Sequence, residues 1–125
     1  LFGAPQPLEN SAQCAVSAAQ DMLGMIEMLN AEREMAQDPA LRVGIGIATG
    51  EVVAGYAGTD ARATYTCVGK TVNLAARLEA HTKVLGEAIL MDLRTQSNLQ
   101  DNALCRAMPD ASLKGFSEAV AVFAV

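Results

Sequence analysis

The stretch from Tyr65 to Glu79, YTCVGKTVNLAARLE, decides the fold of this chain. It predicts a short strand, a tight turn at Gly69 and a helix from about Thr71 to Thr82. Asn73 and Arg77 are four residues apart, so a helix places both side chains on one face. An amide and a guanidinium on one helix face suit a polyphosphate and a developing negative charge.

The same pair has an ordinary alternative. Many helices carry an exposed Asn and Arg, and Arg77 beside Glu79 or Asp92 would then be routine surface chemistry. Against this, asparagine is a poor residue for the middle of a helix. The opposite face is apolar and packs the helix onto a core: Val72, Leu74, Ala75 and Leu78. On the residues alone, both interpretations stay open.

Composition narrows the class of protein. The 125 residues make one domain or a piece of one, and 51% of them are hydrophobic but only 4% aromatic, which predicts an aliphatic core. The net charge of −5 argues against a general nucleic-acid partner, since phosphate contacts call for a basic face. No window holds the roughly 18 apolar residues of a membrane span, so we expect no membrane contact. Three scattered cysteines predict free thiols in a reducing cytoplasm.

The rest of the chain predicts an α+β domain with an antiparallel-rich sheet backed by helices on one face. Leu1 to Pro5 resembles the tail of a strand, and Asn10 or Ser11 can cap a long first helix. The other expected elements are a helix over Ser11 to about Gln37, a strand over Arg42–Ala48, a return strand over Val52–Ala57, and a third strand over Ala63–Val68, antiparallel to the second. After the Asn73 helix come a strand over Glu87–Met91, a small helix begun by Asp92, and late strands over Ala103–Ala107 and Ala119–Ala124, joined through Pro109 and Lys114-Gly115.

Gly44, Gly46 and Gly50 do not form a nucleotide-binding loop. Their spacing is GxGxxxG and a strand follows instead of a helix, so the dinucleotide fingerprint is absent, and there is no P-loop either. We interpret these glycines as serving sheet geometry and close packing across an interface.

Two further residues are ambiguous on sequence alone. Lys114 lies in a loop before the last strand, where a lysine is usually a solvated turn residue but can also meet a phosphate as a point charge. Thr66 lies within an expected strand, where β-propensity alone accounts for it.

Three blocks in order resemble the class III nucleotide cyclases, most of all the bacterial branch. They are LFGAP at 1–5, RVGIGIATGEVVAG at 42–55, and the block at 65–79; the LKG at 113–115 also fits. The resemblance covers essentially the whole chain. It implies a ferredoxin-like cyclase domain of which residues 1–125 are the C-terminal portion, with the first strands and a helix missing.

The resemblance also implies roles for five residues. Asn73 and Arg77 would orient the ribose and triphosphate and stabilise charge during ring closure. Lys114 would bind the terminal phosphate. Thr66 falls where the family selects the base and favours ATP over GTP, and the backbone of Cys67 would touch the base.

The implied reaction converts ATP to cyclic AMP and pyrophosphate with Mg²⁺ or Mn²⁺, in a head-to-tail homodimer. One domain supplies metal carboxylates and its partner supplies the Asn and Arg. The family's metal-binding aspartates and base-selecting lysine lie upstream of the LFGAP block, so we assign no metal ligand to this chain. We therefore expect the chain to be inactive alone.

The alternative is a non-catalytic cyclase-homology domain that dimerises and regulates a partner. Its main support is Lys70, which stands where bacterial relatives usually have Asp. Against it stands the joint presence of Thr66, Asn73, Arg77 and Lys114. A diguanylate cyclase is excluded, because its GG[DE]EF block is absent.

Overall fold

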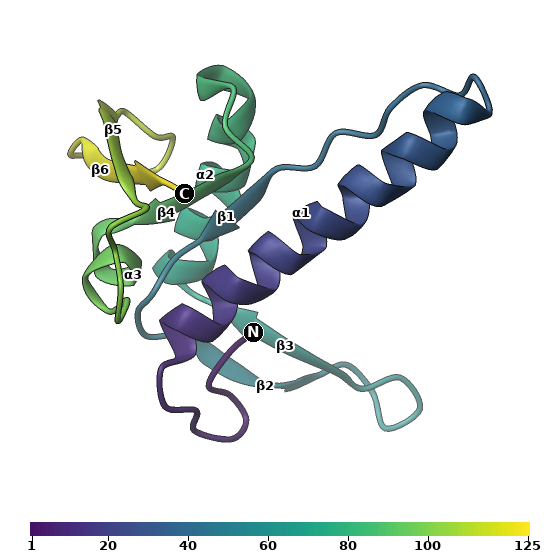
Figure 1. Ribbon diagram of the computed structural model, residues 1–125. Helices are drawn as coiled ribbons and strands as arrows, with labels where there is room; N and C mark the ends of the chain where they lie inside the picture. Colours follow the sequence, from purple (N-terminus) through teal and green to yellow (C-terminus); the bar gives the residue numbers. More distant parts are fainter.

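The computed structural model describes residues 1–125. Its elements in chain order are α1 (Ser11–Met35), β1 (Ile45–Ile47), β2 (Val53–Ala57), β3 (Thr64–Val68), α2 (Lys70–Leu85), β4 (Ile89–Asp92), α3 (Leu93–Ser97), β5 (Arg106–Ala111) and β6 (Val120–Ala124) (Figure 1).

Four strands form the main sheet, in the order β1-β4-β6-β5. β1 pairs with β4 in parallel, whereas β4 with β6 and β5 with β6 are antiparallel. β2 and β3 form a separate antiparallel hairpin. The predicted α+β class with an antiparallel-rich sheet is therefore confirmed.

The core lies between α2 and the centre of the sheet. All four residues of β4 are buried, as expected for a short apolar strand with neighbours on both edges. The core cluster joins Leu78 of α2 to residues of β4, β5, β6 and the loop after β5: Leu90, Ala111, Leu113, Val122 and Ala124. The face of α2 that carries Leu78 is thus fixed against the sheet.

Glycines let α2 approach β1 directly. A β-carbon added at Gly46 would overlap the Ala75 carbonyl oxygen and the Glu79 amide nitrogen, both backbone atoms of α2. One added at Gly44 would overlap the hydroxyl of Thr82. This confirms close packing at Gly44 and Gly46, within the chain between β1 and α2.

α2 runs from Lys70 to Leu85, three residues beyond the predicted end at Thr82. Thr82 is buried, and its hydroxyl donates a hydrogen bond to the carbonyl oxygen of Glu79 within the helix. The helix ends instead at Gly86, whose φ of 68° is the left-handed conformation that glycine adopts easily.

Several sequence predictions were wrong in detail. Leu1 to Pro5 forms no strand, and β2 does not return beside β1, although its predicted antiparallel pairing with β3 is confirmed. β5 begins at Arg106 rather than Ala103 and includes Pro109, which we had placed in the connection. Pro109 is tolerated because β5 is an edge strand with a bulge between Met108 and Ala111. Asn10 is the N-cap residue of α1, but its side chain makes no capping bond.

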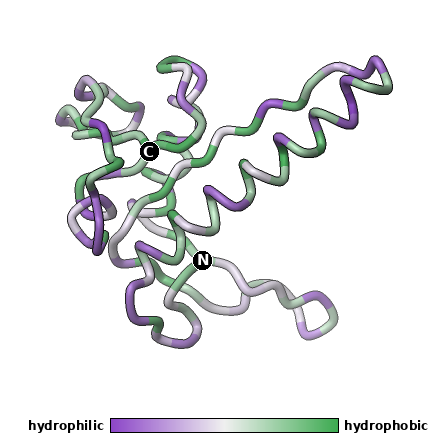
Figure 2. Tube along the Cα trace, viewed as in Figure 1, coloured by the Kyte–Doolittle hydropathy of each residue, from purple (hydrophilic) through white to green (hydrophobic).

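The outer half of α1 extends past the sheet, and the segment from 37 to 44 returns beside it (Figure 1). The side-chain amide of Asn30 fastens the two together: Nδ2 donates to the Leu41 carbonyl at 2.9 Å, and the Leu41 amide donates to Oδ1 at 2.7 Å. Figure 2 shows apolar residues along this helix as well as in the sheet, and Met25, Met28 and Met35 are exposed. No helix is both long and apolar enough to cross a bilayer.

Candidate functional site

α2 carries Asn73 and Arg77 on the face opposite Leu78. Leu78 is fully buried, whereas Asn73 and Arg77 are both exposed. Arg77 forms no ion pair, since the one salt bridge of the chain joins Arg106 to Glu87. Arg77 therefore does not form the surface pair with Glu79 or Asp92 that we considered. The amide and the guanidinium point outward with their donors available to a ligand.

The hairpin places Thr66 and Cys67 on opposite faces. Thr66 pairs with Gly55 and Cys67 with Ala54, and side chains alternate along a strand. Thr66 is exposed, while the half-buried Cys67 lines a cavity behind α2. The structure therefore presents the Thr66 side chain on the surface and turns the Cys67 side chain inward.

A single residue, Gly69, separates β3 from α2. Its φ of 139° is a backbone conformation that residues with a side chain rarely adopt. The Gly69 carbonyl oxygen accepts a hydrogen bond from the backbone N–H of Asn73 at 3.1 Å. The strand that carries Thr66 is thus joined directly to the first turn that carries Asn73. These two predicted site residues lie on one continuous unit.

Lys114 lies in the turn between β5 and β6, and its side chain is exposed. The turn is closed by a bond from the Phe116 amide to the Leu113 carbonyl at 3.1 Å, and Leu113 is buried. A hollow of 310 Å³ is lined by Lys70 together with residues of this turn, including Gly115 and Phe116. The turn that carries Lys114 therefore lies beside the N-terminus of α2. The placement of Lys70 at this point was missed, because nothing local in the sequence indicates it.

The predicted site residues do not line an enclosed pocket of this chain. A mainly apolar cavity of 430 Å³ lies between the N-terminal segment, α1, β1 and α2, and it includes Cys67 but not Thr66, Asn73, Arg77 or Lys114. Four of the five predicted residues thus lie on open surface. Three of them, Thr66, Asn73 and Arg77, belong to the unit of β3 and α2.

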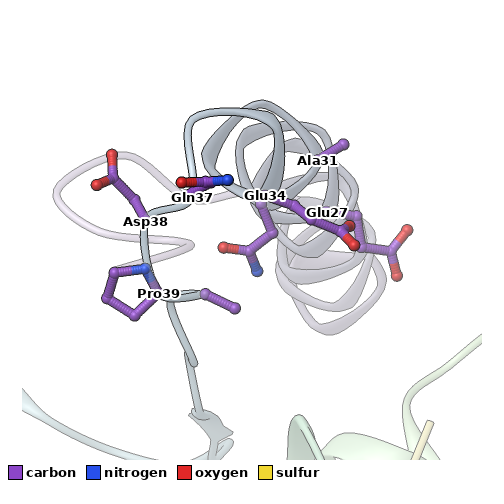
Figure 3. A pocket seen from close by; sticks show the side chains of 8 residues that line it. Glu27, Ala31, Glu34, Gln37, Asp38 and Pro39 are labelled. Carbon is purple, nitrogen blue, oxygen red and sulfur yellow. The ribbon is translucent and has the colours of Figure 1, made fainter.

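The chain contains no group of three or more His, Cys, Asp or Glu residues that could hold a metal ion. The hollow at the far end of α1 is acidic, but the carboxylates of Glu27 and Asp38 point away from each other (Figure 3). The three cysteines are free, and burial, aided by the charge of Asp101, raises the pKa of the Cys105 thiol. The residues present do not fit a Mg²⁺ or Mn²⁺ site.

Three comparisons with known proteins agree on the family of this chain. The family model of the adenylate and guanylate cyclase catalytic domain matches residues 1–124. Adenylate cyclase 1 of Rhizobium meliloti (strain 1021) is 31% identical over 117 residues, which cover 94% of this chain and 17% of that protein.

Two solved structures are similar over nearly the whole chain. The adenylyl cyclase CyaB from P. aeruginosa superposes with a TM-score of 0.86 at 32% identity, covering 98% of this chain and 63% of that one. The guanylyl cyclase Cya2 superposes with a TM-score of 0.83 at 30% identity, covering 98% and 61%. This chain thus spans 17% of the curated relative and less than two thirds of each solved chain. The family model, the relatives and the fold agree: this chain belongs to the family of adenylate and guanylate cyclase catalytic domains.

Proposed function

We propose that residues 1–125 are the C-terminal portion of a single class III catalytic domain whose parent protein converts ATP to cyclic AMP and pyrophosphate. The observation that carries this proposal is the exposed, unpaired placement of Asn73 and Arg77 on α2, within a sequence block that matches the family. In the reaction, the ribose 3′ oxygen bonds to the α-phosphorus. The bond from that phosphorus to the bridging oxygen breaks, and pyrophosphate leaves.

Each site residue has a role suited to its chemistry. The Asn73 amide orients the ribose, and the Arg77 guanidinium stabilises negative charge that develops on the transferring phosphate. Lys114 binds the terminal phosphate as a point charge. Thr66 and the Cys67 backbone contact the base and select ATP, a choice that matters because the similar structures include both adenylyl and guanylyl cyclases.

Mg²⁺ or Mn²⁺ would supply charge neutralisation on the phosphates, and this chain has no group of three or more His, Cys, Asp or Glu residues to hold it. We propose that the ligands come from upstream residues of the partner domain in a head-to-tail homodimer. The open position of the site residues supports a site completed by another surface. On this proposal, residues 1–125 alone have no cyclase activity. The parent protein works in the cytoplasm, and this segment contacts neither nucleic acid nor membrane.

The test is cyclic nucleotide production by the catalytic domain of the parent, with ATP and GTP each supplied with Mn²⁺. Asn73→Ala and Arg77→Ala should each lower cyclic AMP production by about 100-fold or more, as removing a transition-state donor does. Lys83→Ala is the matched control, because Lys83 is an exposed cation on another face of the same helix. Both site variants should keep the unfolding midpoint of the wild type, since neither side chain is buried.

A product made only from GTP would overturn the assignment of Thr66 to ATP. Turnover by residues 1–125 alone would overturn the composite site. No product from either nucleotide, in a protein shown to be folded and dimeric, would favour the alternative: a non-catalytic domain that regulates a partner. The observation that favours this alternative is Lys70, exposed at the first position of α2.

A further inference from the structure

A buried carboxylate holds the turn that leads into the site hairpin. Asp92 is 6% exposed, and its Oδ1 accepts three hydrogen bonds: from the Thr95 amide at 3.0 Å, the Thr95 hydroxyl at 2.6 Å and the Thr49 amide at 3.3 Å. The hydroxyl of Thr49 lies 2.8 Å from that of Thr95. Because the Thr95 hydroxyl donates to Asp92, the Thr49 hydroxyl must donate to Thr95. The Thr49 hydroxyl thus donates to the Thr95 hydroxyl, which in turn donates to the Asp92 carboxylate.

Only part of this network serves the cap of α3. An N-cap needs one bond to a backbone amide of the first turn, and the Thr95 amide provides it. The bond to the Thr49 amide reaches a residue 43 positions away, two residues after the end of β1. Asp92 therefore also fixes the position of the Thr49-Gly50 turn.

The other side of this turn touches α2. A β-carbon added at Gly50 would lie 2.5 Å from the hydroxyl of Thr71, in the first turn of α2 and two residues before Asn73. The chain then continues into β2, where Gly55 pairs with Thr66. The turn thus lies between Asp92 on one side and the elements that carry Asn73 and Thr66 on the other.

We propose that Asp92 is a positioning residue for the nucleotide site: through the Thr49-Gly50 turn, it sets where the start of α2 and the base of the hairpin lie. The consequence for catalysis rests on the proposed function, but the coupling of Asp92 through the turn to the start of α2 does not. Asp92 touches no part of the site directly. A displacement of about 1 Å at a site residue costs on the order of 100-fold in rate, so a small movement of this turn is enough to matter.

The first experiment measures amide hydrogen exchange by NMR in the parent catalytic domain, a measurement that needs no catalytic activity. Asp92→Ala should speed exchange of the Thr49 backbone amide, which loses its acceptor, and of the Asn73 backbone amide, each by about tenfold relative to amides in the middle of α1. Asp92→Asn keeps an Oδ1 acceptor and should behave like the wild type. Asp101→Ala is the matched control. It also removes a carboxylate that accepts a hydrogen bond from a backbone amide, that of Ala103, but in an exposed loop.

Thr49→Val serves where Asp92→Ala fails to fold. It keeps the α3 cap and both bonds of Thr95 to Asp92, and it removes only the hydroxyl link from the turn. It should speed exchange at Asn73 in the same direction but less. An unchanged Asn73 backbone amide in whichever variant is folded would overturn the proposal. Either the turn would then move without α2, or the bonds of Thr49 would not hold the turn in place.

The second experiment measures kcat and KM for cyclic AMP production by the parent catalytic domain. Asp92→Ala should lower kcat on the order of 10-fold to 100-fold per folded domain, with a smaller change in KM, and Asp92→Asn should restore it. A merely structural role would lower the amount of folded protein and leave kcat per folded domain unchanged, which would overturn the proposal. If the wild type makes no cyclic nucleotide while exchange remains coupled, the proposed function fails and the positioning role of Asp92 stands.

Discussion

At the scale of single residues, the basic side chains of this chain differ in whether their N–H groups are already bound to a carboxylate. Arg106 makes a two-point pair with Glu87, with Nη1 to Oε1 at 3.0 Å and Nη2 to Oε2 at 2.8 Å. Arg77 and Lys114 are exposed and form no ion pair. A guanidinium that is already bound in this way is poorly placed for phosphate, so Arg77 and Lys114 are the better candidates.

The Glu87 pair makes stability depend on acid pH. The hydrogen bond from Arg106, with a smaller contribution from its charge, lowers the pKa of Glu87 in the folded chain. Its stabilisation is therefore present above the unfolded pKa of about 4.3 and is lost as the pH falls through the lower folded value. Glu87→Gln should lower the thermal unfolding midpoint slightly at pH 7 and less as the pH drops below about 4. A gap of constant size at all pH values would show that the pair is not its cause.

At the scale of elements, α2 and β1 meet through backbone rather than side chains. Gly46 faces the backbone of α2 near Ala75 and Glu79, and no side chain at position 46 fits without moving the helix. The height of α2 above the sheet, and with it the position of Asn73 and Arg77, depends on this contact. Gly44 and Gly46 thus serve the site without touching it.

We predict opposite effects for two Gly→Ala changes. Gly46→Ala should lower the free energy of unfolding by about 1–3 kcal/mol, since the added methyl group overlaps fixed backbone atoms. Gly24→Ala should raise it by roughly 0.5–1 kcal/mol, because Gly24 lies inside α1 with nothing within 4 Å of the new β-carbon. Urea unfolding of both variants, with Gly55→Ala as a second position in open space, measures the difference. Equal effects at positions 46 and 24 would contradict the close contact.

At the scale of the whole molecule, the chain exposes more surface than its mass suggests. Its accessible surface is 8632 Å², whereas a compact monomer of 13.1 kDa exposes about 6,400 Å². The exposed apolar residues include Met25 and Met35 on α1 and Val53 and Tyr56 on the hairpin. On the proposed function, the rest of the catalytic domain and its partner domain would cover part of this surface.

A composite site makes specific activity depend on concentration. If each site takes residues from two domains, dilution of the parent catalytic domain below its dimer dissociation constant should lower cyclic AMP production per domain. Sedimentation velocity at the same concentrations would give the fraction of dimer, and the two curves should coincide. Constant activity per domain in a sample shown to be monomeric would contradict the shared site.

Prediction from sequence succeeded where the determinants are local. The periodicity of residues 71–82 is enough to form α2, and helical geometry then places Asn73 and Arg77 together on the face opposite Leu78, as the structure confirms. Asp92 is likewise found at the start of a short helix, because a carboxylate can accept from an amide three residues ahead.

Prediction failed where the partner of a segment lies far along the chain. The antiparallel pairing of Val53–Ala57 with β3 was predicted and is confirmed, but only packing decides that this strand leaves β1. Pro109 is admitted to β5 only because that strand is an edge. The contact of Asp92 with Thr49 and the approach of Lys70 to the β5–β6 turn are of the same kind. Local propensity and periodicity therefore suffice for the helix that carries the site, whereas its distance from the sheet and the turn that braces it come from non-local contacts that exist only once the chain has folded.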